Sequence, residues 1–281
     1  MSNLIYNENS WPEFGVAHHW ITTDITSSFK TNKGTRFEMI KRPRWGLACY
    51  MDNAIQSCEV DEYLYHESLV HPAMSSVTSA NRVMIIGGGE GATAREVLKW
   101  PTVTQVDMYE WDKEVVDEFK AVYPQWAKGA WNDARLTVYY EDIFTVIQQQ
   151  PSHKYDVIII DLFEPDDDNK QQWLTLLENI KHWITADGAV SIYTGIRNIL
   201  DKTKQYEISR YILESHFEKD RLITNRQLIR YKVYIPSFSG ESMFILLKNT
   251  NGPCEINDVV MRESGVHLRD DIWKSYQVFN Y

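Results

Sequence analysis

The amino-acid sequence predicts an α/β protein in which a small antiparallel β domain precedes a doubly wound, mostly parallel sheet. Three observations support this fold class. From residue 80 onward, apolar runs of strand length alternate with segments of helical periodicity, which is typical of a parallel sheet covered by helices. Before that point, β-branched runs are separated by turn residues. The last two predicted strands are joined by a turn too short for a crossover helix, so they must pair antiparallel.

The N-terminal part has the signature of a small sheet. Strands are predicted at residues 35–40, 46–51 and 55–57, and the turn that precedes each of them contains Gly34, Pro43 and Asn53, respectively. A helix is predicted to follow from about residue 61 to residue 70 and to stop before Pro72. We therefore place the β domain at residues 1–75 and the larger domain at residues 76–281.

The larger domain is predicted to contain seven strands and four main helices. The continuous apolar run at 82–86 is typical of a strand buried on both faces. The predicted strands are residues 82–86, 105–109, 136–140, 155–160, 189–193, 226–235 and 242–248, and the predicted helices are residues 92–100, 113–122, 171–183 and 199–216. The closing antiparallel hairpin is typical of the Rossmann-like sheets of S-adenosylmethionine-dependent transferases and is lacking in NAD-binding domains.

Composition and charge restrict the class of function. The chain has 281 residues, 43% of them hydrophobic and 24% charged, as in globular proteins. Its 29 Lys and Arg against 39 Asp and Glu give a net charge of −10, which repels a nucleic-acid backbone and permits a cationic substrate.

Cysteines and apolar runs indicate the compartment. The three cysteines, Cys49, Cys58 and Cys254, fit neither a disulfide framework nor a CxxC metal site, so we expect buried thiols and no bound metal. The first residues lack an apolar signal segment, and no run approaches the ~18 residues of a membrane span. We expect a cytoplasmic protein without membrane contact.

A glycine-rich loop, residues 87–91, lies between a predicted strand and a predicted helix. Its glycines, Gly87 and Gly89 among them, allow a sharp turn and the close approach of a ligand. Glu110 follows the next strand, roughly 20 residues beyond the loop, where a carboxylate can accept hydrogen bonds from ribose hydroxyls. Asp142 follows the third strand and can reach an adenine amino group. The structural alternative for both acids is a charged residue at a helix N-terminus.

Glu90 restricts the nucleotide that this loop can bind. The loop lacks the Lys-Ser/Thr of a Walker A motif. An anionic side chain inside it would repel a pyrophosphate but attract a sulfonium or ammonium group. The sequence therefore favours an adenosine that carries a positive tail.

Several segments, taken in order, resemble the polyamine aminopropyltransferases, the spermidine and spermine synthase family. They are residues 55–62 (IQSCEVDE), 65–72 (YHESLVHP), 87–92 (GGGEGA), 95–99 (REVLK) and 155–161 (YDVIIID) with Pro165 shortly after. The resemblance extends from about residue 35 to residue 248. It is closest to the thermospermine synthase branch, as judged by Glu90, by residues 161–165 (DLFEP) and by residues 235–238 (IPSF).

The resemblance implies that an aminopropyl group moves from decarboxylated S-adenosylmethionine, a co-substrate, to a polyamine, with thermospermine as the first expected product and spermidine or spermine next. Asp161 would accept the proton of the attacking amine, and Tyr65 would hold the amine or relay its proton. The residues implied to bind the donor are Gln56, His66, Gly87, Gly89, Glu90, Glu110 and Asp142. The residues implied to bind the acceptor are Glu164, Trp20 and Phe238. The resemblance also implies a homodimer or homotetramer and a gate loop at residues 166–168.

Some positions depart from the family pattern. Glu38 stands where an amide helps to bind the donor tail, and Met39 stands where a carboxylate is usual. Phe163 and Glu164 replace shorter residues, and Tyr193-Thr194 stands near a usual glutamine. These departures leave the identity of the acceptor open.

Two other functions remain possible from the sequence. One is a methyltransferase of the same architecture that uses intact S-adenosylmethionine. Glu90 and Glu38 disfavour it, because they would oppose the carboxylate of that ligand. The other is a protein that binds polyamines or nucleosides without turnover.

Overall fold

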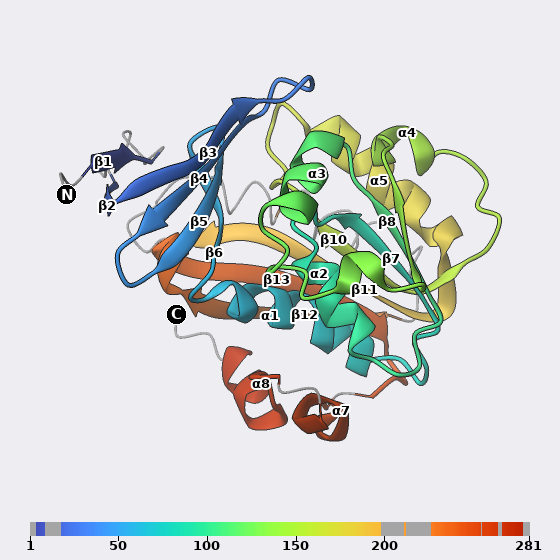
Figure 1. Cartoon of the computed structure of the whole chain (residues 1–281). Coiled ribbons are helices and arrows are strands. Elements are labelled where there is room, and N and C mark those ends of the chain that lie inside the picture. Colours follow the sequence, from blue (N-terminus) through green and yellow to red (C-terminus); the bar gives the residue numbers. More distant parts are fainter. Residues whose placement is uncertain are drawn as a thin grey trace.

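The computed structural model describes residues 4–8, 18–197, 211, 226–253, 255–263 and 266–277. The described chain forms two main sheets and a short two-stranded ribbon (Figure 1). The larger sheet and its helices form the body of the molecule, and the smaller sheet lies against one end of it.

The large sheet has seven strands, and its order confirms the predicted fold class. In space they are β12 (Arg226–Ile235), β13 (Gly240–Asn249), β11 (Ile184–Arg197), β10 (Tyr155–Asp161), β7 (Arg82–Gly87), β8 (Gln105–Tyr109) and β9 (Leu136–Tyr139). The last five are parallel, whereas β13 pairs antiparallel with both β11 and β12. The closing hairpin expected from the short turn is therefore present.

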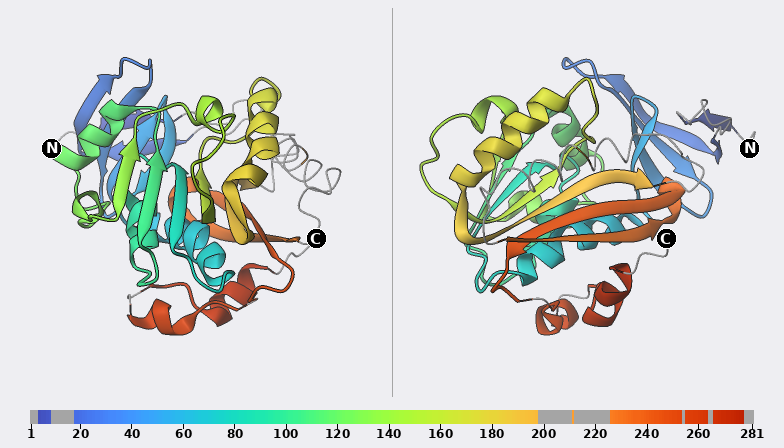
Figure 2. Two further views of the ribbon diagram at one scale, coloured as in Figure 1. Left: turned by 90° about the vertical axis from the view of Figure 1, so that its right-hand side faces the viewer. Right: turned by 180° about the vertical axis from the view of Figure 1, so that it is seen from behind.

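The central strands are apolar on both faces because helices cover both. In β7, Val83 and Ile85 pack into one hydrophobic core, while Met84 and Ile86 pack into another. The described helices are α1 (Glu62–Ser75), α2 (Ala92–Leu98), α3 (Lys113–Ala121), α4 (Ile143–Val146), α5 (Lys170–Trp183), α7 (Asp258–Glu263) and α8 (Asp270–Tyr276). Helices α1, α2, α7 and α8 contribute to the first core, α4 and α5 to the second. Figure 2 shows α7 and α8, in red, below the sheet.

The small sheet confirms the antiparallel character of the N-terminal part. Its strands, in spatial order, are β3 (Asp24–Lys30), β4 (Arg36–Arg42), β5 (Gly46–Met51) and β6 (Ala54–Cys58). Strands β1 (Leu4–Asn7) and β2 (His19–Thr22) form the separate ribbon. Helix α3 joins the two parts, because Glu118 accepts a hydrogen bond from Ser27 at 2.5 Å.

Helix α1 does not stop before Pro72, as the sequence predicts, but continues to Ser75. A proline inside a helix cannot donate to the carbonyl four residues earlier, which here belongs to Ser68. The hydroxyl of Tyr231 on β12 donates to that carbonyl at 2.8 Å. The tertiary contact therefore compensates for the lost helical hydrogen bond. The other long predicted helix, residues 199–216, lies almost wholly outside the described residues.

Within the described segments, the remaining regular elements are two short 3-10 turns, at Ala130–Asn132 and Pro236–Phe238. No helix among the described segments is long and apolar enough to cross a membrane.

Candidate active site

The site lies where the parallel strands end. Asp161 is the last residue of β10, and it pairs in register with Gly87, the last residue of β7. A Cβ at Gly87 would lie 2.0 Å from the Asp161 carbonyl oxygen, and the φ angle of Gly87 is +85°. Only glycine allows the two strands to pass so closely at this point. The glycine loop is thereby held directly beside Asp161.

The Asp161 carboxylate accepts hydrogen bonds from two hydroxyl groups. Tyr65 on α1 donates to Oδ1 at 2.7 Å, and Thr93 on α2 donates to Oδ2 at 2.6 Å. The structure thus brings together the two predicted catalytic residues. Asp161 makes no ion pair with any of the Lys, Arg or His side chains that the structure describes.

The ring of Tyr65 lies in an aromatic cluster. Its centroid is 5.2 Å from that of Tyr193, 5.5 Å from that of Phe244 and 5.9 Å from that of Phe238. Aromatic pairs at these distances are favourable and restrict the orientation of each ring. Phe238, predicted to line the acceptor groove, is therefore one ring away from the Asp161 carboxylate.

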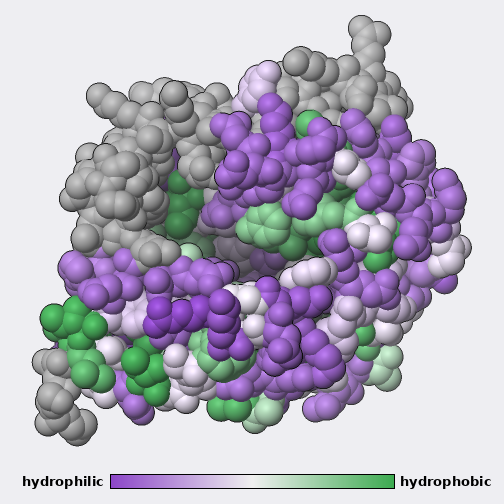
Figure 3. Space-filling view, turned by 90° about the horizontal axis from the view of Figure 1, so that it is seen from above, coloured by the Kyte–Doolittle hydropathy of each residue, from purple (hydrophilic) through white to green (hydrophobic). Residues whose placement is uncertain are grey.

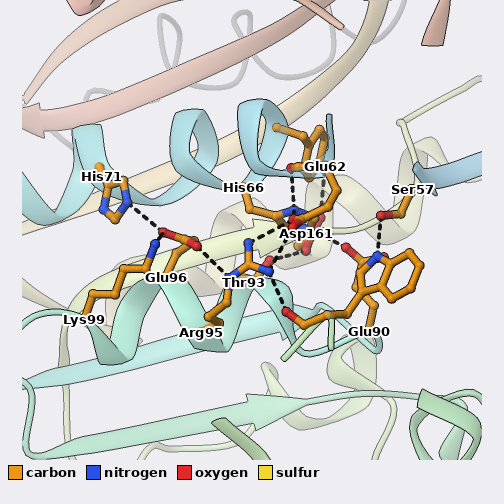
Figure 4. Close-up of polar contacts among 12 residues, drawn as sticks. Ser57, Glu62, His66, His71, Glu90, Thr93, Arg95, Glu96, Lys99 and Asp161 are labelled. Atoms are coloured by element: carbon orange, nitrogen blue, oxygen red, sulfur yellow. Dashed lines mark hydrogen bonds and ion pairs between the residues drawn. The ribbon is translucent and has the colours of Figure 1, made fainter. Parts of the chain in front are cut away.

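Two predicted donor-binding residues, Glu90 and His66, form an ion pair. His66 Nε2 lies 2.5 Å from Glu90 Oε1, and His66 Nδ1 lies 2.8 Å from Glu62 Oε2 (Figure 4). Burial alone would lower the pKa of His66, but the two carboxylates outweigh it and raise that pKa well above its ordinary value. His66 is therefore held as an imidazolium between two anions.

This pair continues into a buried network between α1 and α2 (Figure 4). Arg95 makes two parallel bonds of 2.9 Å to the carboxylate of Glu62, and its Nε lies 2.7 Å from Glu96. Glu96 also contacts His71 at 2.9 Å and Lys99 at 2.6 Å. Bidentate arginine–carboxylate pairs are strong and directional. The network therefore fixes the helix that carries His66 against the helix that follows the glycine loop.

Glu110 lies at the end of β8, next to the same loop. Its Oε2 would be 3.0 Å from a Cβ at Gly89, and its Oε1 accepts from the Asp112 amide at 2.9 Å. Burial raises the pKa of Glu110 to about 7, against the lowering effect of the Asp112 and Trp111 amides. One oxygen of this carboxylate thus faces the loop, as expected for a residue that binds ribose hydroxyls.

Asp142 caps helix α4, which is the structural alternative considered from the sequence. Its side chain accepts from the Phe144 amide at 3.0 Å and from the Thr145 hydroxyl at 3.1 Å. The cap keeps Asp142 at the carboxyl end of the sheet, because α4 directly follows β9.

Glu164 lies three residues beyond Asp161 and close to β11, because a Cβ at Gly195 would be 3.1 Å from Glu164 Cγ. Burial raises the pKa of the Glu164 carboxyl, while a hydrogen bond with the Tyr193 hydroxyl acts in the opposite direction. The predicted gate loop follows directly. There Asp166 accepts from the amides of Asp168 and Asn169, so this acidic run begins with an ordered turn.

Two predicted residues lie in the N-terminal strands. Gln56, on β6, is exposed, and its amide donates to the Ala54 carbonyl at 3.2 Å. Trp20, on β2, packs against Trp45 at 5.8 Å and against the guanidinium of Arg42 at 3.3 Å. Among the described residues, no hydrogen bond, ion pair or ring contact joins either side chain to Asp161.

The sequence analysis gives no role to Thr93, and Glu62 and Arg95 enter it only as members of family motifs. Glu62 stands four residues before His66, and this spacing places both on one helix face. Thr93 opens the helix after the glycine loop, so it faces the strand ends. The sequence positions of Glu62 and Thr93 are therefore sufficient to suggest both residues as site candidates. The pairing of Arg95 with Glu62 cannot be predicted in this way, because it joins two separate helices.

One face of the molecule is hollowed. Figure 3 shows a depression near the middle of one face, with hydrophobic side chains beside it and hydrophilic groups around its rim. Within the described part of the chain, no cluster of His, Cys, Asp and Glu could hold a metal ion. The ionisable side chains described around Asp161 are the carboxyls of Glu90 and Glu62, the phenol of Tyr65 and the imidazole of His66.

Comparison with known proteins agrees with this geometry. The family model of the spermine/spermidine synthase domain matches residues 62–258, which include Tyr65, Glu90, Asp161 and Glu164. The chain belongs to the spermine/spermidine synthase family.

Relatives in this family include proteins named as polyamine aminopropyltransferases. The protein from Pyrobaculum calidifontis is 37% identical over 207 residues, which cover 72% of this chain and 68% of that protein. The protein from Sulfurisphaera tokodaii is 38% identical over 222 residues, which cover 78% and 70%. The crystal structure of spermidine synthase from Thermotoga maritima has the same fold, with a TM-score of 0.82 at 20% identity over 99% of this chain and 92% of that chain.

A second solved member of the spermine/spermidine synthase family extends the comparison to a bound ligand. It is a spermidine synthase in complex with the transition state analogue AdoDATO, with a TM-score of 0.84 at 20% identity and coverage of 99% and 92%. A complex with this ligand has thus been determined for a protein that shares the fold of this chain.

Proposed function

We propose that this protein is a polyamine aminopropyltransferase. It would transfer the aminopropyl group of decarboxylated S-adenosylmethionine to a polyamine and release 5'-methylthioadenosine. The observation that carries the proposal is the Asp161 carboxylate. It lies beside the glycine loop, and within the described residues it is held by two hydroxyl donors and by no cation. Such a group can take the proton of an attacking amine.

The reaction is a displacement at saturated carbon. The amine nitrogen attacks the methylene next to the sulfonium, the carbon–sulfur bond breaks, and its electron pair goes to sulfur. Asp161 takes the proton that the nitrogen loses. No covalent bond to the protein is needed. The protein therefore has to hold two cationic molecules in line, and positioning of this kind can contribute several kcal/mol to the rate.

The proposed donor fits the charges around the loop. Glu90 would bind the ammonium of the aminopropyl tail, Glu110 would accept hydrogen bonds from ribose hydroxyls, and Asp142 would lie toward adenine. Gln56, His66, Gly87 and Gly89 complete the proposed donor site. Glu164 and Phe238 lie on the side of Tyr65 and would contact the acceptor, together with Trp20.

Intact S-adenosylmethionine fits less well. Its carboxylate would meet Glu90 and Glu62, which the structure places on either side of His66. This arrangement disfavours the methyltransferase alternative on electrostatic grounds. A protein that binds without turnover would keep the donor site, and a product assay separates that alternative from the enzyme.

Thermospermine is the product that we propose first, and spermidine or spermine next. The support is the sequence of three segments: Glu90 in the loop, residues 161–165 and residues 235–238. The proposed acceptor site would include Glu164 and lie near Tyr193, and both residues depart from the usual family pattern. The choice of the attacking nitrogen depends on this groove.

We also propose that the protein is a homodimer or homotetramer that associates through its N-terminal strands. The support is a set of exposed apolar side chains on β1, β2 and β3, namely Leu4, Ile5, Ile21 and Ile25, whose exposed fractions are 48%, 68%, 55% and 44%. Strand edges with exposed apolar residues are usually covered in soluble proteins.

The experiment is a product assay by chromatography and mass spectrometry. Purified protein is incubated with decarboxylated S-adenosylmethionine and, in parallel, with putrescine, spermidine or other amines. We expect an aminopropylated amine and methylthioadenosine in equal amounts. Asp161→Asn should lower kcat by about 10²–10⁴-fold. The matched control is Asp117→Asn on the surface of α3, which should leave the rate unchanged. Absence of methylthioadenosine with every amine would refute the proposal.

A further inference from the structure

The turn between β3 and β4, residues 31–35, packs on the loop that carries Glu110. This loop joins β8 to α3. Three successive residues of the turn contact the loop or the start of α3: the Thr31 hydroxyl donates to Asp112 Oδ2 at 2.7 Å, the Asn32 amide donates to Glu114 at 2.5 Å, and the Lys33 ammonium lies 3.5 Å from the centre of the Trp111 ring. Figure 1 shows this turn beside α3. The N-terminal sheet therefore reaches the donor side of the proposed site.

Asp112 connects this turn to Glu110. The backbone amide of Asp112 donates to Glu110 Oε1 at 2.9 Å. Its side chain caps α3, because Oδ1 accepts from the Glu114 amide at 3.1 Å. The other carboxylate oxygen, Oδ2, accepts from the Thr31 hydroxyl. Both side-chain bonds restrict the residue whose amide holds Glu110.

The bond between Thr31 and Asp112 is buried and comes from a closed turn. Each of the two residues is 5% exposed. A hydrogen bond to a carboxylate that is shielded from water is stronger than one at the surface. The backbone of Thr31 is itself held, because its amide donates to the Thr35 carbonyl at 2.9 Å and its carbonyl accepts from the Gly34 amide at 3.0 Å. The turn therefore presents the hydroxyl to Asp112 in a fixed place.

The Asp112 amide leaves one oxygen of Glu110 for a ligand. It binds Oε1, whereas Oε2 would be 3.0 Å from a Cβ at Gly89 and so faces the glycine loop. If the Asp112 amide moved, the Glu110 side chain could rotate and Oε2 would leave this position. A carboxylate that is already oriented before the ligand arrives binds more tightly, since no side chain has to be ordered on binding.

We propose that Thr31 is a positioning residue for the donor: through Asp112 it holds the Glu110 carboxylate in the orientation that accepts hydrogen bonds from ribose hydroxyls. The inference rests on the proposed function, because it takes Glu110 as the residue that binds the ribose. It gives the N-terminal sheet a part in recognition of the nucleoside through Thr31.

Binding of 5'-methylthioadenosine, measured by titration calorimetry, tests the proposal without turnover. Thr31→Val keeps the shape of the side chain and removes the donor. Loss of a buried hydrogen bond to a charged group predicts roughly tenfold weaker binding of the nucleoside. Thr31→Ser keeps the hydroxyl and should bind within twofold of the wild type. Equal affinities of the wild type and Thr31→Val would overturn the proposal.

A nucleoside without ribose hydroxyls distinguishes orientation of Glu110 from a general disturbance of the site. Thr31→Val and the wild type should bind the 2',3'-dideoxy form of methylthioadenosine equally well, because the hydroxyls that Glu110 would bind are missing. The tenfold difference should thus be confined to the nucleoside with both hydroxyls. An equal loss of affinity for the two nucleosides would overturn the proposal.

Ser27→Ala is the matched control. Ser27 lies on the same hairpin, and its hydroxyl also donates to a carboxylate, that of Glu118 in α3, at 2.5 Å. This bond joins the hairpin to α3 without passing through Asp112. Ser27→Ala should therefore leave the affinity for methylthioadenosine within twofold of the wild type. If it weakens binding as much as Thr31→Val does, the effect comes from loosening of the hairpin on α3 and the proposal fails.

A second variant keeps the proposal testable if Thr31→Val does not fold. Asp112→Asn retains an oxygen to cap α3 and the amide that donates to Glu110, but it loses the acceptor of the Thr31 hydroxyl. It should weaken methylthioadenosine binding by the same factor of about ten. Unchanged affinity in a folded Asp112→Asn protein, confirmed by circular dichroism, would overturn the proposal.

The binding measurement also separates this inference from the proposed function. Weaker binding by Thr31→Val in a protein that forms no product with any amine would support the role of Thr31 and refute the proposed reaction. Product formation by the wild type together with unchanged binding by Thr31→Val would support the reaction and refute the role of Thr31. No binding of methylthioadenosine by the wild type would refute both.

Discussion

Substitution of Glu62 by glutamine tests whether the buried network stabilises the fold. Burial raises the pKa of Glu62, but the bonds to His66 and Arg95 outweigh it and bring the pKa from 4.5 to about 2. A difference of this size between the folded and unfolded chain corresponds to about 3 kcal/mol of stability at neutral pH. Glu62→Gln removes the charge, and it leaves the Arg95 guanidinium opposite a neutral amide.

The sign of the pH dependence follows from the depressed pKa. The stabilisation by Glu62 is complete above pH 4.5, the ordinary pKa, and it is lost as the pH falls toward 2. The free energy of unfolding of the wild type should therefore exceed that of the variant by about 3 kcal/mol at pH 7. The difference should narrow progressively below pH 4.5.

The assay is urea-induced unfolding followed by circular dichroism, at pH 7 and at a series of lower pH values. At pH 7 we also expect a fall in Tm of roughly 6 °C or more. The control is Glu178→Gln, because Glu178 is an exposed residue of α5 and no contact of its side chain is seen among the described residues. A loss below about 1 kcal/mol at pH 7 would contradict the reasoning. So would a difference that stays constant down to pH 3.

Three further outcomes are expected. Gly87→Ala should abolish product formation and lower the Tm, because its Cβ would lie 2.0 Å from the Asp161 carbonyl oxygen; an active, stable variant would show that the strand ends can separate. Because the raised pKa of Glu110 makes its ionisation oppose folding, the free energy of unfolding of Glu110→Gln should rise relative to that of the wild type as the pH rises from 4.5 to about 7, by up to about 3 kcal/mol. Urea unfolding at pH 5 and pH 8 measures this change, and an equal difference between variant and wild type at both pH values would contradict it. Tyr231→Phe should cost about 1–3 kcal/mol in urea unfolding, because it leaves the Ser68 carbonyl without a donor; a neutral effect would mean that another donor replaces it.

The large sheet could be predicted from the sequence because its signal is local. The run of β7 is apolar on both faces, and the short turn between β12 and β13 allows only an antiparallel pair. The same holds for Asp161, which ends a predicted strand, and for Glu90, which lies in the loop between a predicted strand and a predicted helix. Residues of this kind are placed by their immediate neighbours in the chain.

Other features could not be predicted because they depend on distant partners. The continuation of α1 through Pro72 requires the Tyr231 hydroxyl, which lies on another sheet element. The pairing of Glu62 with Arg95 requires the packing of two helices that no local pattern relates. Trp20, which is predicted to contact the acceptor, packs against Trp45 and Arg42, and its indole N–H donates to Glu8. These contacts join separate segments, so the turn and strand pattern could not foresee them.

The position of His66 between two carboxylates has a consequence for calorimetry. A cationic ligand that binds Glu90 takes one of the two anions that stabilise the imidazolium. The affinity of His66 for its proton then falls, and a fraction of a proton passes to the buffer. The heat of binding should therefore vary with the ionisation enthalpy of the buffer. That variation gives the number of protons released per ligand bound. This number measures the extent to which the ligand cation replaces the His66 imidazolium as the partner of Glu90.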